Sequence, residues 1–222
     1  MTFTTRFAPS PTGPLHIGHA YSAILAHDMA RAEGGQFLLR IEDIDQARAR
    51  PEWEQAIYDD LTWLGLSWDG PVMRQSARMD VYKTALAQLW DRNLLFGCTC
   101  NRRDIAAAAS APHEGDPPVG PDGIIYPGTC RGKYVPPLVT APPGDKAIRL
   151  HSGMLALTRV FVPRVSEGDF VGSIETGGGP DGQRGLIEFT PEDFETRIGA
   201  IVLARRDLGT SYTMKVVLDD AA

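Results

Sequence analysis

The stretch that decides the fold covers residues 6–19 and reads RFAPSPTGPLHIGH. The run before its turn-rich centre, residues 2–8, predicts a short strand, and regularly spaced apolar side chains after it predict a helix. Those side chains are Tyr21, Ile24, Leu25 and Met29. A strand end followed by a turn and a helix N-terminus favours phosphate binding, because free backbone N–H groups and the positive end of the helix point into the turn.

The residues that follow complete a βαβ unit. Gly34 and Gly35 end the helix, and residues 37–41, FLLRI, form a compact apolar run that suits a buried parallel strand. This strand ends in the acidic pair Glu42 and Asp43. The sequence therefore predicts the entry to a doubly wound α/β sheet of the Rossmann-like kind, which binds ligands at the carboxyl ends of its strands.

Two amphipathic helices are predicted after this unit. Pro51 opens the first helix, which ends at Gly65, and Ser76 caps the second. Apolar side chains recur at helical spacing in both segments. They are Trp53, Ala56, Ile57, Leu61 and Leu64 in the first, and Met79, Tyr82, Leu86, Leu89 and Trp90 in the second.

The second half of the chain has a different character. Residues 112–143 are rich in proline and glycine, which excludes regular helix or central strand, and residues 177–185 predict a glycine-rich loop. Apolar runs at 201–203 and 216–218 predict a return to strands. The predicted organisation is a first half of a Rossmann-like domain over 1–97, an insertion over 98–192 and a return to the same sheet over 193–222.

Composition limits the function classes. The 222 residues carry 22 basic and 28 acidic side chains, a net charge of −6, which argues against nucleic-acid binding through bulk charge alone. The sequence shows neither an apolar run long enough to span a membrane nor a secretory leader, so we expect a cytoplasmic protein. Three cysteines make a disulfide framework a poor explanation and raise the question of a metal site.

Two histidines open the predicted helix. His16 and His19 lie one turn apart on the same face, where both imidazoles can donate to a triphosphate, and Gly18 between them lets a flat base approach the backbone. The alternative is a capped helix start with two surface histidines. The strand, turn and helix around the pair favour the phosphate site.

An acidic run closes the neighbouring strand. Residues 40–45 read RIEDID. In a βαβ unit this end of the strand lies beside the turn that follows the first strand. A carboxylate here can hold a substrate ammonium group while Arg6 holds a substrate carboxylate through a bidentate fork. That polarity suits an amino acid. A helix-capping acidic turn with a structural salt bridge is the alternative.

Cys98 and Cys100 lie close in sequence, and Cys130 follows in the insertion. Soft thiolates favour zinc, which can hold together a segment that has little backbone pairing. The fourth ligand is open on this reasoning. Unliganded cysteines beside a loop are the alternative.

The stretch from Arg6 to His19 and the run at 39–45 together resemble the catalytic domain of glutamyl-tRNA synthetases, and residues 16–19 match the HIGH signature of class I aminoacyl-tRNA synthetases. Within that superfamily the chain is most similar to the glutamyl-Q tRNA(Asp) synthetases, paralogues without an anticodon-binding domain that attach glutamate to queuosine. Ile44, Val216 and the run at 19–22 favour this paralogue. The resemblance implies a class I catalytic domain with a zinc-stapled insertion.

The resemblance also implies roles for individual residues. His16, Gly18 and His19 would bind ATP, with both histidines counted as catalytic. The glutamate pocket would contain Arg6, Ala8, Ser10, Glu42 and Tyr212. The implied reaction is attack of a glutamate carboxylate on the α-phosphorus of ATP, usually with Mg²⁺, and it needs no covalent protein nucleophile.

For the metal, the resemblance implies one structural zinc ion held by Cys98, Cys100, Cys130 and Tyr126, with water or His113 as alternatives to the tyrosine. The implied partners are L-glutamate, ATP and the queuosine-containing anticodon stem-loop of tRNA(Asp), and we expect a monomer. Such a stem-loop is a small target whose splayed bases can be read one by one.

Some residues depart from the family pattern. Family members continue into a second pocket arginine and a lysine-bearing KMSKS loop after the position of Ala222, which leads us to expect a fragment with weak or no adenylate formation. Lys215 stands where a small residue on an inward strand is usual, and Gly199-Ala200 where an acidic residue is usual. The alternative functions are a fragment of a glutamyl-tRNA synthetase that charges tRNA(Glu), and an inactive zinc-containing module that binds glutamate or nucleotide.

Overall fold

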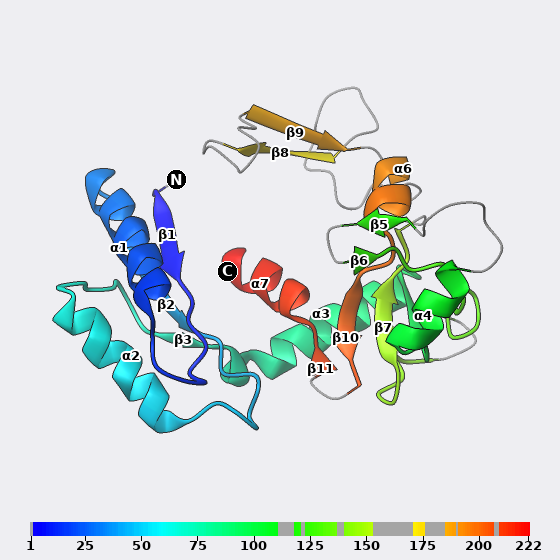
Figure 1. Cartoon of the computed structure of the whole chain (residues 1–222), viewed down its shortest axis with the longest axis horizontal. Coiled ribbons are helices and arrows are strands. Elements are labelled where there is room, and N and C mark those ends of the chain that lie inside the picture. The colour runs from blue at the N-terminus through cyan, green and yellow to red at the C-terminus, as the bar shows by residue number, and fades with distance from the viewer. Residues whose placement is uncertain are drawn as a thin grey trace. The chain divides into compact units, whose positions relative to one another are not determined.

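The structure is a computed structural model that describes residues 2–110, 118–120, 123–136, 140–152, 171–175, 185–189, 191–206 and 209–222. Its contacts divide the chain into two units, Met1–Tyr82 and Lys83–Ala222 (Figure 1).

The first unit is built on a parallel sheet in the order β1-β2-β3. Its elements are β1 (Thr4–Phe7), α1 (Ile17–Ala32), β2 (Gln36–Ile41), α2 (Pro51–Trp63), β3 (Met73–Arg74), the 3-10 turn η1 (Gln75–Arg78) and the start of α3 (Met79–Asp91). Strands β1 and β2 pair in parallel from Thr4↔Gln36 to Phe7↔Leu39, with α1 as the crossover between them. The predicted βαβ unit and α/β fold class are confirmed.

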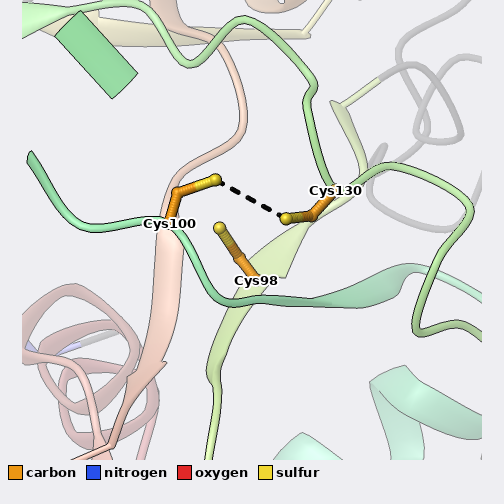
Figure 2. Close-up of side chains that lie close together, drawn as sticks. All are labelled: Cys98, Cys100 and Cys130. Carbon is orange, nitrogen blue, oxygen red and sulfur yellow. Dashed lines mark hydrogen bonds between the residues drawn. The ribbon is translucent and has the colours of Figure 1, made fainter. Parts of the chain in front are cut away.

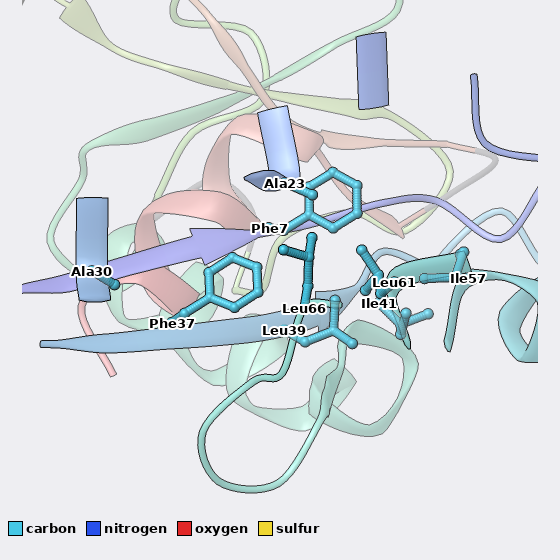
Figure 3. Close-up of a cluster of buried hydrophobic side chains, with 9 residues drawn as sticks. All are labelled: Phe7, Ala23, Ala30, Phe37, Leu39, Ile41, Ile57, Leu61 and Leu66. Atoms are coloured by element: carbon cyan, nitrogen blue, oxygen red, sulfur yellow. The ribbon is translucent and has the colours of Figure 1, made fainter. Parts of the chain in front are cut away.

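Nine buried side chains form the core of this unit (Figure 3). They are Phe7, Ala23, Ala30, Phe37, Leu39, Ile41, Ile57, Leu61 and Leu66. The strands contribute the large side chains, and α1 contributes only alanines, whose small size lets the helix lie close to the sheet. Tyr21 is 67% exposed, so the apolar spacing that predicts α1 does not mark its buried face.

The predicted cap at Ser76 is wrong. Ser76 lies inside η1, and α3 begins only at Met79. Its hydroxyl and its backbone N–H both donate to the carboxylate of Asp43, and the backbone bond measures 2.8 Å. A buried carboxylate on the neighbouring strand end therefore recruits the serine for a tertiary contact, where the sequence suggests a local one.

The second unit contains an antiparallel sheet in the order β11-β10-β7-β4. Its strands are β4 (Leu95–Cys98), β7 (Ala147–Leu150), β10 (Val202–Arg205) and β11 (Gly209–Thr210). Two further hairpins are β5 (Val119–Gly120) with β6 (Gly123–Ile124), and β8 (Val171–Glu175) with β9 (Gly185–Phe189). The remaining elements are α4 (Arg102–Ala109), α6 (Pro191–Asp193), the π-helical η2 (Phe194–Ile198) and α7 (Tyr212–Asp220).

Alternation along β4 and β7 gives this sheet two different faces. One face packs Leu95, Ile148 and Leu150 into an apolar cluster with Trp90 and Met214. The other face carries Phe96 and Cys98 into a second cluster that contains Tyr126, Cys130 and Ala200. The cysteines thus lie on a sheet face of their own, separate from the larger apolar cluster of this unit.

The predicted strand at 216–218 is wrong, because Tyr212–Asp220 forms helix α7. Ser211 caps it by accepting the Met214 N–H at 3.3 Å, and its buried residues, Met214, Lys215 and Asp219, recur at helical spacing. A short apolar run fits either conformation, and here the cap decides. The strand predicted at 201–203 is confirmed as β10.

The domain boundaries at 97/98 and 192/193 stay a prediction. Strand β7 lies inside the segment predicted as an insertion and pairs with both β4 and β10. Strands β10 and β11 belong to the antiparallel sheet of the second unit. The glycine-rich loop predicted at 177–185 lies outside the described residues except for Gly185, which opens β9. Among the described residues, no helix is both long and apolar enough to cross a membrane.

Candidate functional site

The turn after β1 is fixed against the end of β2 by backbone hydrogen bonds. The N–H of Glu42 donates to the carbonyl of Pro9 at 3.0 Å, and the N–H of Arg50 donates to the carbonyl of Pro11 at 3.0 Å. Prolines have a carbonyl acceptor but no N–H donor, so the donors that fix the turn come from residues outside it. These bonds place the start of α1 beside the acidic run, as the βαβ prediction requires.

His16 and His19 form a reciprocal cap at the start of α1. Nδ1 of His16 accepts the Gly18 N–H at 3.1 Å, and Nδ1 of His19 accepts the His16 N–H at 3.2 Å. The two ring centroids are 3.8 Å apart. The phosphate-site reading and the capped-helix reading therefore describe the same geometry, with the histidines themselves as the caps.

This cap fixes the tautomer of both neutral rings. Because each Nδ1 accepts a backbone hydrogen, each remaining proton lies on Nε2, which is then a donor. Burial, followed by the neighbouring His16, lowers the pKa of His19 below its ordinary value. A pair of Nε2–H donors at a helix N-terminus suits an anionic ligand.

The acidic run divides into three environments. Glu42 accepts a hydrogen bond from Arg40 at 2.9 Å, and both side chains are largely buried, at 10% and 3% exposure. Asp43 accepts from Ser76, as described above. Asp45 accepts from Arg48 at 2.6 Å near the surface, and that bond lowers the pKa of the Asp45 carboxyl. The structure thus contains the salt bridge of the alternative reading, and it involves Glu42, the predicted ammonium ligand.

The other predicted pocket residues fall in both units. Arg6 is half-buried on β1, Ala8 follows that strand, and Ser10 is exposed in the turn. Together with Glu42 they lie at the carboxyl ends of two adjacent parallel strands. Tyr212 is the first residue of α7 in the second unit and is 66% exposed. Its role in a glutamate pocket stays a prediction.

Three cysteines converge in the second unit (Figure 2). The sulfurs of Cys98, Cys100 and Cys130 all lie within 4.8 Å of one another, and Cys100 and Cys130 are 3.5 Å apart. Cys98 lies in strand β4, and Cys130 lies in the segment after Gly128. Cys130 is 30 residues beyond Cys100 in the sequence. This group could hold a metal ion, as the sequence predicts.

The hydroxyl oxygen of Tyr126 lies beside this cluster. It lies 3.4 Å from the sulfur of Cys98 and 3.8 Å from that of Cys100, and it accepts the Cys130 N–H at 2.8 Å. Sulfur ligands about 2.3 Å from one tetrahedral zinc ion lie about 3.8 Å apart, so the spacings fit such an ion. The alternative ligand His113 lies outside the described residues.

The cluster has unequal thiols. Burial opposes ionisation of Cys130, but hydrogen bonds from Thr99 and Tyr126 outweigh it and lower the pKa of Cys130 to about 6. Burial and the contact with Cys130 raise the pKa of Cys100 to about 11. Burial and the neighbouring thiols raise the pKa of Tyr126.

Sequence reasoning missed Arg149. This residue lies in β7, and its guanidinium carbon is 4.2 Å from the ring centroid of Tyr126. The signal in the sequence was an arginine at an alternating position of the apolar run 147–150, AIRL. It places a cation on the sheet face that carries Cys98.

Known proteins resemble this chain over most of its length. The family described as tRNA synthetases class I (E and Q), catalytic domain, matches residues 2–117. The glutamyl-Q tRNA(Asp) synthetase of Rhodobacter capsulatus is 56% identical over 98% of this chain and 72% of its own length. That of Nocardia farcinica is 38% identical over 98% of this chain and 59% of its own length.

A crystal structure of a glutamate tRNA ligase from Elizabethkingia meningosepticum, in complex with its amino acid, has the same fold. It aligns with a TM-score of 0.65 at 24% identity and covers 100% of this chain and 42% of that one. The strand, turn and helix with their histidine pair, and the two relatives that match nearly the whole chain, agree: the chain belongs to the class I tRNA synthetases, and within them to the glutamyl-Q tRNA(Asp) synthetase family.

Proposed function

We propose that this protein activates glutamate with ATP and transfers it to the queuosine in the anticodon of tRNA(Asp). The observation that carries the proposal is the reciprocal histidine cap of α1, set beside the acidic end of β2, in a chain 56% identical to a glutamyl-Q tRNA(Asp) synthetase. Because the chain spans 72% and 59% of the lengths of the two relatives, the activity is proposed for the whole protein.

In the first step, the N-terminus of α1 and the Nε2–H groups of His16 and His19 bind the phosphates of ATP. The positive end of the helix dipole adds to the attraction of these two donors for the phosphates. A glutamate carboxylate oxygen attacks the α-phosphorus, the bond to the bridging oxygen breaks, and pyrophosphate leaves. Mg²⁺, which accompanies ATP, supplies neutralisation of the phosphate charge.

Arg6 and Glu42 orient the amino acid. The guanidinium of Arg6 holds one substrate carboxylate and leaves the other for attack, and the carboxylate of Glu42 receives the ammonium group. Arg40 donates to Glu42 at 2.9 Å and so fixes the direction of that carboxylate. Ala8 and Ser10 complete this side of the pocket at the strand end.

In the second step, a hydroxyl of the cyclopentene-diol ring of queuosine attacks the glutamyl carbonyl, and AMP leaves. Because a net charge of −6 disfavours RNA binding through bulk positive charge, we infer that the protein contacts a small RNA target, the anticodon stem-loop. We further infer that the protein is cytoplasmic and monomeric. Size-exclusion chromatography with light scattering tests the monomeric state.

The cysteine cluster is proposed to hold one structural zinc ion. Cys98, Cys100 and Cys130 would supply sulfur, and Tyr126 oxygen, a closed ligand set without a position for substrate. When bound, the ion supplies a crosslink between β4 and the segment around residue 130. Elemental analysis of purified protein should give close to one zinc per chain, and a Cys98→Ser, Cys130→Ser variant should lose it.

The decisive experiment follows radiolabelled glutamate. The full-length protein should label tRNA(Asp) that contains queuosine, and leave unlabelled both queuosine-free tRNA(Asp) and tRNA(Glu). His16→Ala and His19→Ala should each abolish labelling, while His27→Gln, in the same helix but away from the turn, serves as the matched control. Label on the 3′ terminal adenosine of tRNA(Glu) would instead establish the glutamyl-tRNA synthetase reaction.

A further inference from the structure

Strand register places Arg149 on the same sheet face as the metal cluster. In the β4–β7 pair, Phe96 is opposite Arg149 and Cys98 is opposite Ala147. Cys98 and Phe96 are two residues apart, so their side chains share one face, and their partners share it with them. Ile148, between these partners, points into the apolar cluster on the other face.

The guanidinium of Arg149 is held between two groups. Its carbon is 4.2 Å from the ring centroid of Tyr126, and Nη1 donates to the carbonyl of Ala200 at 2.8 Å. Its Nε is buried and has no hydrogen-bond partner. Among the described residues, Arg149 forms no ion pair with a carboxylate, whereas Arg131 pairs with Glu195. A partly desolvated cation of this kind needs negative charge close by.

The bound metal centre would supply that charge. Three thiolates around one divalent ion would already carry a surplus negative charge, and a Tyr126 hydroxyl that loses its proton to bind the ion would add to it. We propose that Arg149 is a positioning residue of this centre: it packs on the Tyr126 ring so that the hydroxyl oxygen faces the sulfurs, and its cation offsets the charge of the ligand set. The inference rests on the zinc centre proposed above.

Zinc affinity measured by chelator competition tests the proposal on the purified chain. Arg149→Gln keeps a donor for the Ala200 carbonyl and removes the charge, so it should bind zinc about tenfold more weakly, the value of a partly buried cation–π contact. Arg149→Lys keeps the charge and should lose less. The matched control is Arg102→Gln, which makes the same charge change at an exposed residue beside Cys100 and should leave affinity unchanged.

A double-mutant cycle tests whether Arg149 acts through the tyrosine. In a Tyr126→Phe background, Arg149→Gln should reduce zinc affinity by a smaller factor than in the wild type, because no hydroxyl oxygen is left to orient and only the charge of the thiolates remains to be offset. Absorption spectra with Co²⁺ in place of zinc should shift in Tyr126→Phe, while Arg149→Gln should keep the wild-type band positions at saturating metal.

Three outcomes would overturn the inference while leaving the zinc centre intact. They are wild-type affinity in Arg149→Gln, an equal loss in Arg102→Gln, and an undiminished effect of Arg149→Gln in the Tyr126→Phe background. Failure of the centre itself is distinguishable, because wild-type protein would then bind no zinc, or Tyr126→Phe would leave the Co²⁺ spectrum unchanged.

Discussion

Asp43 and Asp45 stand two residues apart in the same acidic run, and replacing each with alanine should give opposite results. Asp43 is 8% exposed and accepts both the N–H and the hydroxyl of Ser76, which joins the end of β2 to η1. A hydrogen bond to a charged group contributes about 1.5–3 kcal/mol. Asp43→Ala removes two such bonds and leaves two donors without a partner, so the first unit should lose about 3–5 kcal/mol.

Two further variants define the comparison. Asp43→Asn keeps one acceptor oxygen and should cost the first unit about half as much. Asp45→Ala removes the surface pair with Arg48, and exposed pairs of this kind contribute little, so its stability should stay at the wild-type value.

Hydrogen exchange followed by mass spectrometry is the appropriate assay, because it reports each unit separately. Amides of β2 should lose protection in Asp43→Ala, and those of β4 in the second unit serve as the internal reference. Equal protection of β2 in Asp43→Ala and Asp45→Ala would refute the argument that burial distinguishes these carboxylates.

Three other predictions concern the histidine cap and the metal cluster. A methyl group on Gly18 would meet Cε1 and Nδ1 of the His16 ring at 3.1 and 3.2 Å, so Gly18→Ala should displace the ring and weaken ATP binding about tenfold in calorimetry. Because the pKa of His19 is lower in the folded protein, the unfolded chain binds its proton first; thermal melts should show full stability above about pH 6.5 and a loss below it, and His19→Gln should reduce this loss. Removal of metal by a chelator should increase hydrogen exchange around Cys100 and Cys130 while β10 stays protected; uniform loss across the second unit would contradict this.

Local patterns sufficed to predict the βαβ unit that opens the chain. The strand, turn and helix around residues 6–19 and the apolar strand at 37–41 are confirmed because each is specified by neighbours in sequence. The buried face of α1 could not be predicted in the same way. Its alanines carry no hydrophobic signal, yet their small size lets the helix lie close to the strands.

Long-range contacts explain the remaining differences. Ser76 serves Asp43 from 33 residues away, and Arg149 meets Tyr126 only because β7 pairs with β4. Helix α7 was misassigned because the apolar run at 216–218 is too short to show a period. The three cysteines, by contrast, lie together as the sequence predicts, because cysteines in a segment with little backbone pairing favour a shared metal site.

The pairing of Cys98 with Ala147 has a consequence for how this protein can change. The chain leaves the sheet at one residue and re-enters it directly opposite, about 4.8 Å away, a gap that a hairpin of two to five residues closes. Residues 99–146 therefore form a cassette whose length is independent of the strand register. Away from Cys100, Tyr126 and Cys130, residues can be added to it or removed from it without shifting the β4–β7 register, so its loops can diversify while the sheet stays constant.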